Sequence, residues 1–287
     1  MAKRSLALVL HPSRPEAHQL ATQIAGKLID FEIYSASEVT LPGIIKKSQS
    51  ELKNEINRCE LVLVLGGDGT ILRGAEIAHG TEVPVLGVNL GHVGFLAQMG
   101  RPSLDTLVTA IASRSYTTER RMTLGYQVER AGEIVARGWA LNEVAVERNT
   151  EVMIELFVQV DHRPLSRWGC DGVICATPTG STAYAFSAGG PVVWPDVEAL
   201  VLLPLAAHAL FSDPMVISPS SQIAIDVESD TGVLSADGLR KVQLQERDRV
   251  MLTSERSYIH LAHLDDVPFA DRLVAKFKLP VDGWRGE

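Results

Sequence analysis

The 287-residue sequence predicts an α/β domain of Rossmann type followed by a mostly-β sandwich domain. In the first third of the chain, short apolar runs alternate with segments whose apolar residues recur at helical spacing, which is typical of a parallel sheet covered by helices. After about residue 115, strand-like runs follow one another with turn residues between them and little helical periodicity. We therefore expect the change from one domain to the other near residue 118.

Three continuous apolar runs in the first domain predict buried parallel strands, because a strand covered on both faces shows no polar alternation. These runs are Leu6–Leu10, Leu61–Leu65 and Val83–Val88. Apolar residues at helical spacing predict a helix over Pro15–Leu28. A second, short helix is expected over Ile71–His79, ending at Gly80.

The second domain shows six strand-like runs, whose spacing indicates a sandwich. They are Leu124–Val128, Trp139–Val146, Val152–Val160, Ile223–Val227, Val242–Leu244 and Val250–Leu252. The apolar segment Ala199–Leu210 is expected to hold a helix broken near Pro204. Asp265–Phe277 has the register of a final helix.

Composition excludes several classes of partner. The formal net charge is −8, with 35 acidic and 27 basic residues and no block of Lys or Arg, so neither nucleic acid nor a membrane surface is an expected partner. The longest apolar stretch is interrupted by Glu198, Pro204 and His208 and cannot span a bilayer. The three cysteines form no CxxC pair, which argues against a disulfide frame or a zinc site and fits a reducing, cytoplasmic location.

The strongest chemical signal is the loop Gly66-Gly67-Asp68-Gly69-Thr70, which joins the strand Leu61–Leu65 to a helix. Glycines let a phosphate approach the backbone closely, and the helix N-terminus offers unpaired N–H donors. We expect Thr70 to be the N-cap residue. The spacing matches neither the P-loop nor the G-x-G-x-x-G fingerprint.

The aspartate at the tip of this phosphate loop requires an explanation, because a carboxylate repels phosphate. Asp68 has two plausible roles: holding a Mg²⁺ ion that bridges phosphates, or accepting a proton from an attacking hydroxyl. The alternative is an ordinary glycine-rich turn in which Asp68 caps the helix.

A second dense cluster follows an apolar strand and reads Thr177-Pro178-Thr179-Gly180-Ser181-Thr182-Ala183-Tyr184. Its hydroxyls suit ribose or phosphate oxygens, and Tyr184 adds a flat face with a polar tip. The alternative is a turn that leads into a short helix capped by Ser181. No G-x-S-x-G context supports a hydrolase triad.

Two further groups are candidates for binding a ligand. Asn142 and Glu143 are adjacent and would point to opposite faces of a strand, so both reach one ligand only at a strand end or bulge. A solvated strand end is an equally good interpretation. The aromatic ring of Phe95 can stack on a base. Without other evidence, a position in the hydrophobic core is the favoured interpretation.

The chain resembles the NAD kinase family in four groups of residues, which follow in this order: the glycine loop, Asn142-Glu143, Asp171-Gly172 and the Thr177–Tyr184 run. The resemblance covers essentially the whole chain. The glycine loop alone is shared with diacylglycerol and sphingosine kinases, whereas the second run is specific. The resemblance implies an α/β domain over 1–118, completed by 265–287, and a β-sandwich domain over 119–264. It implies transfer of the terminal phosphate of ATP to the 2′-hydroxyl of the adenosine ribose of NAD, with a divalent cation, Mg²⁺ or Mn²⁺.

The resemblance also implies roles for individual residues. Asp68 would accept the proton of that hydroxyl, and Gly66, Gly67, Gly69 and Thr70 would form the phosphate loop, with Arg73 close by. No protein ligand of the metal is assigned. NAD contacts would come from Asp68, Gly69, Arg73, Phe95, Asn142, Glu143, Asp171, Thr182, Ala183, Tyr184 and Ser187. The expected assembly is a homo-oligomer, a tetramer or a dimer.

Three positions depart from the family pattern and put secondary phosphate and NAD contacts in doubt. They are Gly169 and Asp213, where basic residues are common, and Leu239, where Gln is frequent. The sequence leaves open whether polyphosphate replaces ATP and whether NADH is accepted. There are two alternative functions. A lipid kinase would not need the second run, and a non-catalytic NADP sensor would be expected to lose Asp68.

Overall fold

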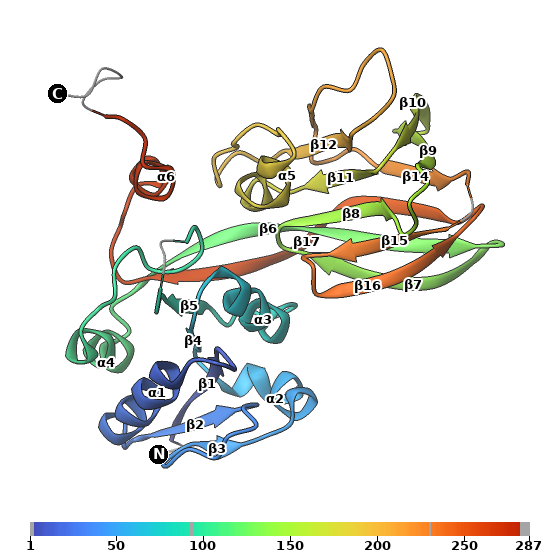
Figure 1. Ribbon diagram of the computed structural model, residues 1–287. Helices are drawn as coiled ribbons and strands as arrows, with labels where there is room; N and C mark the ends of the chain where they lie inside the picture. Colours follow the sequence, from blue (N-terminus) through green and yellow to red (C-terminus); the bar gives the residue numbers. More distant parts are fainter. Residues whose placement is uncertain (1–2, 92–93, 230, 282–287) are drawn as a thin grey trace. The chain divides into compact units, whose positions relative to one another are not determined.

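The computed structural model describes residues 3–91, 94–229 and 231–281, and the chain divides into two compact units (Figure 1). The α/β unit comprises residues 1–120 and 259–287, and the β unit comprises 121–258. Residues 282–287 of the expected returning segment lie outside the described residues.

The α/β unit is built on a parallel sheet with the strand order β3-β2-β1-β4-β5. Its strands are β1 (Arg4–Leu10), β2 (Phe31–Ser35), β3 (Ile45–Lys46), β4 (Val62–Leu65) and β5 (Val85–Val88). The end of β17 (Arg249–His263) adds a further parallel neighbour through Leu261 and Ala262. β2 and β3 lie on one side of β1, and β4 and β5 lie on the other side. This reversal between β1 and β4 is the topological switch point of a Rossmann sheet, where ligands usually bind.

Helices cover both faces of this sheet. They are α1 (Pro15–Lys27), α2 (Gln49–Glu55), the 3₁₀ turn η1 (Ile56–Arg58), α3 (Asp68–Ala78), α4 (Leu104–Ser113) and α6 (Phe269–Phe277). One buried cluster joins Leu20 and Ile24 of α1 and Leu107 of α4 to Leu8 and Leu63 of the sheet. α3 packs on the other face, where Gly74 lies against Val64. The predicted buried strands and the α/β class are confirmed.

The β unit contains two sheets that enclose one apolar core. The first sheet contains β6 (Thr117–Arg130), β7 (Glu133–Ala140), β9 (Ile154–Val160), β10 (Arg163–Cys170), β14 (Ile223–Val227) and β17. The second sheet has the strand order β13 (Met215–Ile217), β12 (Leu200–Leu205), β11 (Gly172–Ala176), β8 (Glu143–Arg148), β15 (Thr231–Ala236) and β16 (Arg240–Gln245). Leu156, Ile225 and Leu252 of the first sheet share a core with Val146, Val173 and Leu202 of the second. This face-to-face packing confirms the predicted sandwich.

The expectation of a helix over Ala199–Leu210 is wrong, because Leu200–Leu205 forms strand β12. Leu200 and Leu202 enter the core between the sheets, while Val201 and Leu203 pack in a second buried cluster on the other face. With both faces covered, the strand shows no polar alternation and cannot be told from a helix by periodicity. Pro204 lies past the last residue of β12 that pairs with β13, where no second neighbour needs its missing N–H.

Two smaller differences concern segments that carry candidate site residues. The run Trp139–Val146, expected as one strand, is broken at Leu141 and Asn142 between β7 and β8. Short elements missed by the sequence, such as β3 and α2, lie in the polar segment before β4. Among the described residues, no helix combines the length and apolar composition needed to cross a membrane.

Replacing Gly74 by Ala is expected to destabilise the protein by about 1–3 kcal/mol, because overpacking forces neighbours apart. A Cβ at Gly74 would lie 2.5 Å from Val64 Cγ2 and 3.3 Å from Val85 Cγ1. Urea unfolding of Gly74→Ala measures the effect. Gly26→Ala is the matched control: nothing lies within 4 Å of its Cβ, and helix propensity should stabilise it slightly. Equal stability of Gly74→Ala and wild type would contradict the close packing of α3 on the sheet.

Candidate functional site

The glycine loop follows β4 and leads into α3. This helix begins at Asp68, three residues before the predicted start at Ile71. Gly67 is the N-cap, and the N–H groups of Thr70 and Ile71 both donate to the Gly67 carbonyl, at 2.8 and 3.1 Å. The expectation that Thr70 is the N-cap is therefore wrong; its side chain is buried in the first turn. The N–H groups of Asp68 and Gly69 have no acceptor within the helix, which leaves them for an anion.

The loop has a glycine at Gly66 and at Gly69 for different steric reasons. A Cβ at Gly66 would lie 2.4 Å from Thr70 Oγ1, so the turn closes only over a glycine. Gly69 is exposed, and nothing lies within 4 Å of the position its Cβ would take. The backbone at Gly69 is therefore open to close approach by a ligand.

The Asp68 carboxylate binds the segment that follows β5. Phe95 N–H donates to Oδ2 at 2.9 Å, and Leu96 N–H donates to Oδ1 at 3.2 Å. A Cβ at Gly94 would lie 2.2 Å from Oδ1, so a glycine is required where this segment meets the carboxylate. Asp68 makes no capping hydrogen bond to its own helix, and the simple capping interpretation is wrong.

Helix α6 holds this segment in place. The Phe95 ring lies 5.8 Å from Phe269 and 5.7 Å from Phe277. Arg272, also on α6, is 4 % exposed, and its Nη1 donates to the Ala97 carbonyl at 2.6 Å. The structure thus places Phe95 in an aromatic cluster, and its contact with a base stays a prediction.

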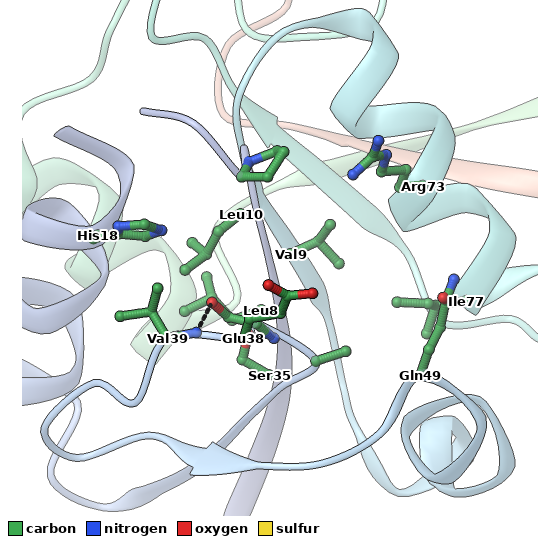
Figure 2. Close-up of a pocket in the computed structure, with 13 residues that line it drawn as sticks. Leu8, Val9, Leu10, His18, Ser35, Glu38, Val39, Gln49, Arg73 and Ile77 are labelled. Carbon is green, nitrogen blue, oxygen red and sulfur yellow. Dashed lines mark hydrogen bonds between the residues drawn. The ribbon is translucent and has the colours of Figure 1, made fainter. Parts of the chain in front are cut away.

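Arg73 is exposed on α3, one helical turn beyond Gly69. It lines a cavity of about 340 Å³ within the α/β unit (Figure 2). Asp68, Gly69 and Arg73 thus all lie in the first half of α3, and their contact with phosphate stays a prediction.

In the β unit, Asn142 and Glu143 lie where β7 ends and β8 begins. The Asp237 carboxylate accepts hydrogen bonds from the N–H groups of Leu141 at 2.9 Å, Asn142 at 2.7 Å and Glu143 at 3.4 Å. Asn142 and Glu143 are 9 % and 7 % exposed, so the interpretation as a solvated strand end is wrong. They meet the condition for reaching a common ligand, a strand end.

The Glu143 carboxyl is under unusual electrostatic constraint. Burial, and next the Asp237 carboxylate, raise its pKa to about 8, although the Tyr184 N–H bond acts against this. Burial raises the pKa of Asp237 as well. Within the described part of the chain, Glu143 Oε2 has no hydrogen-bond partner. A protonated Glu143 would therefore offer an unused donor to a bound ligand.

The second loop packs directly on this strand end. It begins as the 3₁₀ turn η2 (Thr179–Thr182) and continues into α5 (Tyr184–Ser187). A Cβ at Gly180 would lie 2.0 Å from the Asn142 carbonyl oxygen, while Thr177 N–H donates to that oxygen at 2.8 Å. Ser181 is fully buried, and its hydroxyl donates to the Pro178 carbonyl at 2.7 Å. Ser181 therefore stabilises the loop instead of facing a ligand.

Asp171 and Tyr184 line a cavity of about 550 Å³ within the β unit. Asp171 Oδ1 pairs with Arg148 Nε at 2.6 Å. Tyr184 Oη donates to Glu147 Oε1 at 2.7 Å, and burial together with this carboxylate raises the Tyr184 pKa to about 12. Both side chains are thus fixed at the rim of one cavity.

The other predicted positions of this loop are more open. Thr182 and Ala183 are half-buried, and Ser187 is exposed. The three departures from the family pattern lie in β10 (Gly169), in an exposed segment (Asp213) and in the β15–β16 turn (Leu239, half-exposed).

Sequence reasoning missed three residues that shape these sites: Gly94, Arg272 and Asp237. The Asp237-Gly238 dipeptide is a turn signal, and both residues have positive φ, of 53° and 66°. Nothing in the local sequence says that the Asp237 carboxylate turns inward. Among the described residues, no three His, Cys, Asp or Glu side chains converge as a metal site.

Glu143→Gln is expected to flatten the pH dependence of stability. The folded-state pKa of Glu143 is about 8 against an ordinary 4.5, so the folded protein keeps a proton that the unfolded chain releases. This contribution is fully present below about pH 4.5 and is lost as the pH rises through about 8. Gln cannot ionise, so thermal unfolding between those values should lose less stability than in wild type. Identical slopes would contradict the raised pKa.

Family models match both halves of the chain. Residues 6–116 match the family model described as ATP-NAD kinase N-terminal domain, and residues 141–264 match that described as ATP-NAD kinase C-terminal domain. The two matches include every predicted site residue.

Full-length relatives show the same family. The chain is 53 % identical over 299 residues to "NAD kinase" of Thermobifida fusca, covering 99 % of this chain and 92 % of that one. It is 47 % identical over 292 residues to "NAD kinase 2" of Streptomyces avermitilis, covering 99 % and 97 %.

Two solved structures are similar in fold. An NAD kinase from Archaeoglobus fulgidus in complex with ATP has a TM-score of 0.74 at 27 % identity, covering 96 % of this chain and 98 % of that one. Yeast NADH kinase complexed with NADH has a TM-score of 0.88 at 23 % identity, covering 99 % and 90 %, and shows the fold alone. Matches of this extent leave no place for a lipid kinase that shares only the glycine loop: the chain belongs to the NAD kinase family, phosphotransferases that use ATP to convert NAD to NADP.

Proposed function

We propose that the chain transfers the terminal phosphate of ATP to the 2′-hydroxyl of the adenosine ribose of NAD, with Asp68 as the general base. One observation carries the assignment of the base: Phe95 and Leu96 hold the Asp68 carboxylate in a fixed direction at the start of α3. Each carboxylate oxygen has two lone pairs and accepts one of these bonds, so each keeps a second lone pair for a proton.

The proposed step is an in-line displacement. Asp68 takes the proton of the 2′-hydroxyl as its oxygen attacks the terminal phosphorus, the bond to the bridging oxygen breaks, and ADP leaves. The unpaired N–H groups of Asp68 and Gly69 bind phosphate oxygens, supported by the positive end of the α3 dipole. Arg73 adds a full positive charge one turn further along.

A divalent cation, Mg²⁺ or Mn²⁺, is part of the proposal. The described residues offer no cluster of three acidic or His ligands, and Asp68 is the one carboxylate on the glycine loop. This donor set fits a cation that arrives with the triphosphate, since Mg²⁺ is commonly bound by one or two carboxylates plus substrate phosphates. The cation would neutralise phosphate charge.

For NAD, we propose the contacts that the family resemblance implies. The members in the β unit are Asn142, Glu143, Asp171, Thr182, Ala183, Tyr184 and Ser187; Phe95 is proposed near a base. Protonated Glu143 would donate to an acceptor atom of NAD, and the Asn142 amide can both donate and accept. The fixed conformation of the segment Leu141–Glu143 supports this assignment, because a preformed site loses little entropy on binding.

A cytoplasmic homo-oligomer, a tetramer or a dimer, completes the proposal. The three cysteines are free and buried, in keeping with a reducing compartment. Light scattering of the purified protein determines the oligomer number directly.

Asp68→Asn is expected to lower kcat by about 10²–10⁴-fold, because the amide keeps the size of the side chain and cannot take the proton. NADP formation from ATP and NAD measures the loss, with urea unfolding as a check that the variant folds. A near-wild-type kcat would exclude Asp68 as the base.

Thr182→Ala is expected to raise the KM for NAD roughly 3- to 10-fold, the size of one neutral hydrogen bond, with little effect on the KM for ATP. Thr253→Ala, at an exposed position of β17, is the control and should change neither constant. An unchanged KM for NAD in Thr182→Ala would remove Thr182 from the pocket.

A further inference from the structure

The cavity in the α/β unit is lined by charged and polar side chains, of which the proposed mechanism uses Arg73 alone (Figure 2). It has a volume of about 340 Å³ and lies at the carboxyl ends of β1 and β2. His18 of α1, Glu38 of the loop after β2, and Gln49 and Arg73 of α2 and α3 all line it. Val9 and Ile77 supply apolar wall.

The position of this cavity follows from the sheet topology. β1 is the central strand at which the connections reverse direction, and the glycine loop follows its neighbour β4. In open parallel sheets, nucleotides bind outside the carboxyl ends of the strands at such a point. An acidic residue just after the second strand commonly binds ribose hydroxyls there, and Glu38 stands three residues after the end of β2.

Helix α3 connects the glycine loop with the cavity. Gly69, Arg73 and Ile77 follow one another at intervals of four and lie on one face of the helix. Arg73 and Ile77 line the cavity about one and two turns beyond Gly69, roughly 6 and 12 Å along the helix axis. A ligand with its phosphates at Gly69 would therefore bring the rest of its structure past Arg73 and into the cavity.

Two charged side chains of the cavity, Glu38 and Arg73, have no partner in the described part of the chain. Within residues 3–91, 94–229 and 231–281, neither the Glu38 carboxylate nor the Arg73 guanidinium forms an ion pair or a side-chain hydrogen bond. Figure 2 shows both groups directed toward the middle of the cavity, with the His18 ring on another side. Such convergent groups without protein partners are typical of a binding site.

We propose that this cavity binds the base and ribose of the nucleoside triphosphate donor, and that Glu38 accepts hydrogen bonds from its ribose hydroxyls. The inference rests on the proposed function and adds to it the part of the donor that the phosphate loop does not contact. Val9 and Ile77 contact the base, and Arg73 lies beside the phosphates. The volume is at the lower end of ligand cavities and suits one nucleoside better than a dinucleotide.

The charge of Glu38 makes it a determinant of donor class. A ribose offers two hydroxyl donors to a carboxylate, whereas bare polyphosphate offers only negative charge, which the carboxylate repels. Glu38 therefore favours a nucleoside triphosphate over inorganic polyphosphate. The glycine loop alone does not distinguish these two donors, because its N–H groups can bind the phosphates of either one.

Calorimetric binding of ADP, 2′-deoxy-ADP, 3′-deoxy-ADP and inorganic tripolyphosphate tests the proposal on wild type, Glu38→Ala and Asp30→Ala. Asp30 is the control, an exposed acid in the turn after α1 that does not line the cavity. Glu38→Ala should weaken ADP binding about tenfold, as expected for hydrogen bonds to a charged group, and should not weaken tripolyphosphate binding. The deoxy analogues should bind less tightly than ADP to wild type and Asp30→Ala, and this difference should shrink in Glu38→Ala.

Unchanged ADP affinity in Glu38→Ala, or equal weakening of ADP and tripolyphosphate, would overturn the proposal. So would an undiminished penalty for the deoxy analogues in that variant. These binding results do not depend on turnover. Wild-type protein that binds ADP as described and makes no NADP would instead contradict the proposed function, so the two failures are distinguishable. In kinetics, Glu38→Ala should raise the KM for ATP and leave the KM for NAD unchanged.

Discussion

The pair of hydrogen bonds from Phe95 and Leu96 to the Asp68 carboxylate is the constraint on which the α/β unit's site depends. It joins the loop after β4 to the segment after β5, and it explains why Gly94 has no room for a Cβ. The same segment is anchored by Arg272 and two aromatic rings of α6. The direction of one carboxylate is therefore fixed by residues about 30 and 200 positions away in the sequence.

The β unit uses a comparable device. Asp237, at the turn of a hairpin, accepts the N–H groups of the strand end that carries Asn142 and Glu143. Gly180 allows the second loop to touch the Asn142 backbone. Both units thus place a buried or half-buried carboxylate against backbone N–H groups to fix a loop. In the β unit the cost is electrostatic, because two carboxyl groups are buried near one another and the pKa of Glu143 rises to about 8.

The sequence predicted most of the fold and the place of the glycine loop between β4 and α3, since buried parallel strands and a glycine-rich turn leave strong local patterns. It failed where the deciding contacts are distant. The run Leu200–Leu205 reads as a helix because burial on both faces removes the alternation of a strand. Nothing in the local sequence points to the Phe95 and Leu96 amides that bind Asp68, because they lie after the next strand. Nothing in the sequence marks Glu38, since an exposed acid after a strand has no distinctive neighbours in the chain.

The central claim is that the Asp68 carboxylate is held by the Phe95 and Leu96 amides in position to act as the base. Amide nitrogen and proton shifts of Phe95 and Leu96, followed by NMR during a pH titration, test it most directly. Both amides should titrate together with a single midpoint in wild type, and this transition should be absent in Asp68→Asn. Amides that titrate independently of each other, or that keep the transition in Asp68→Asn, would contradict the account.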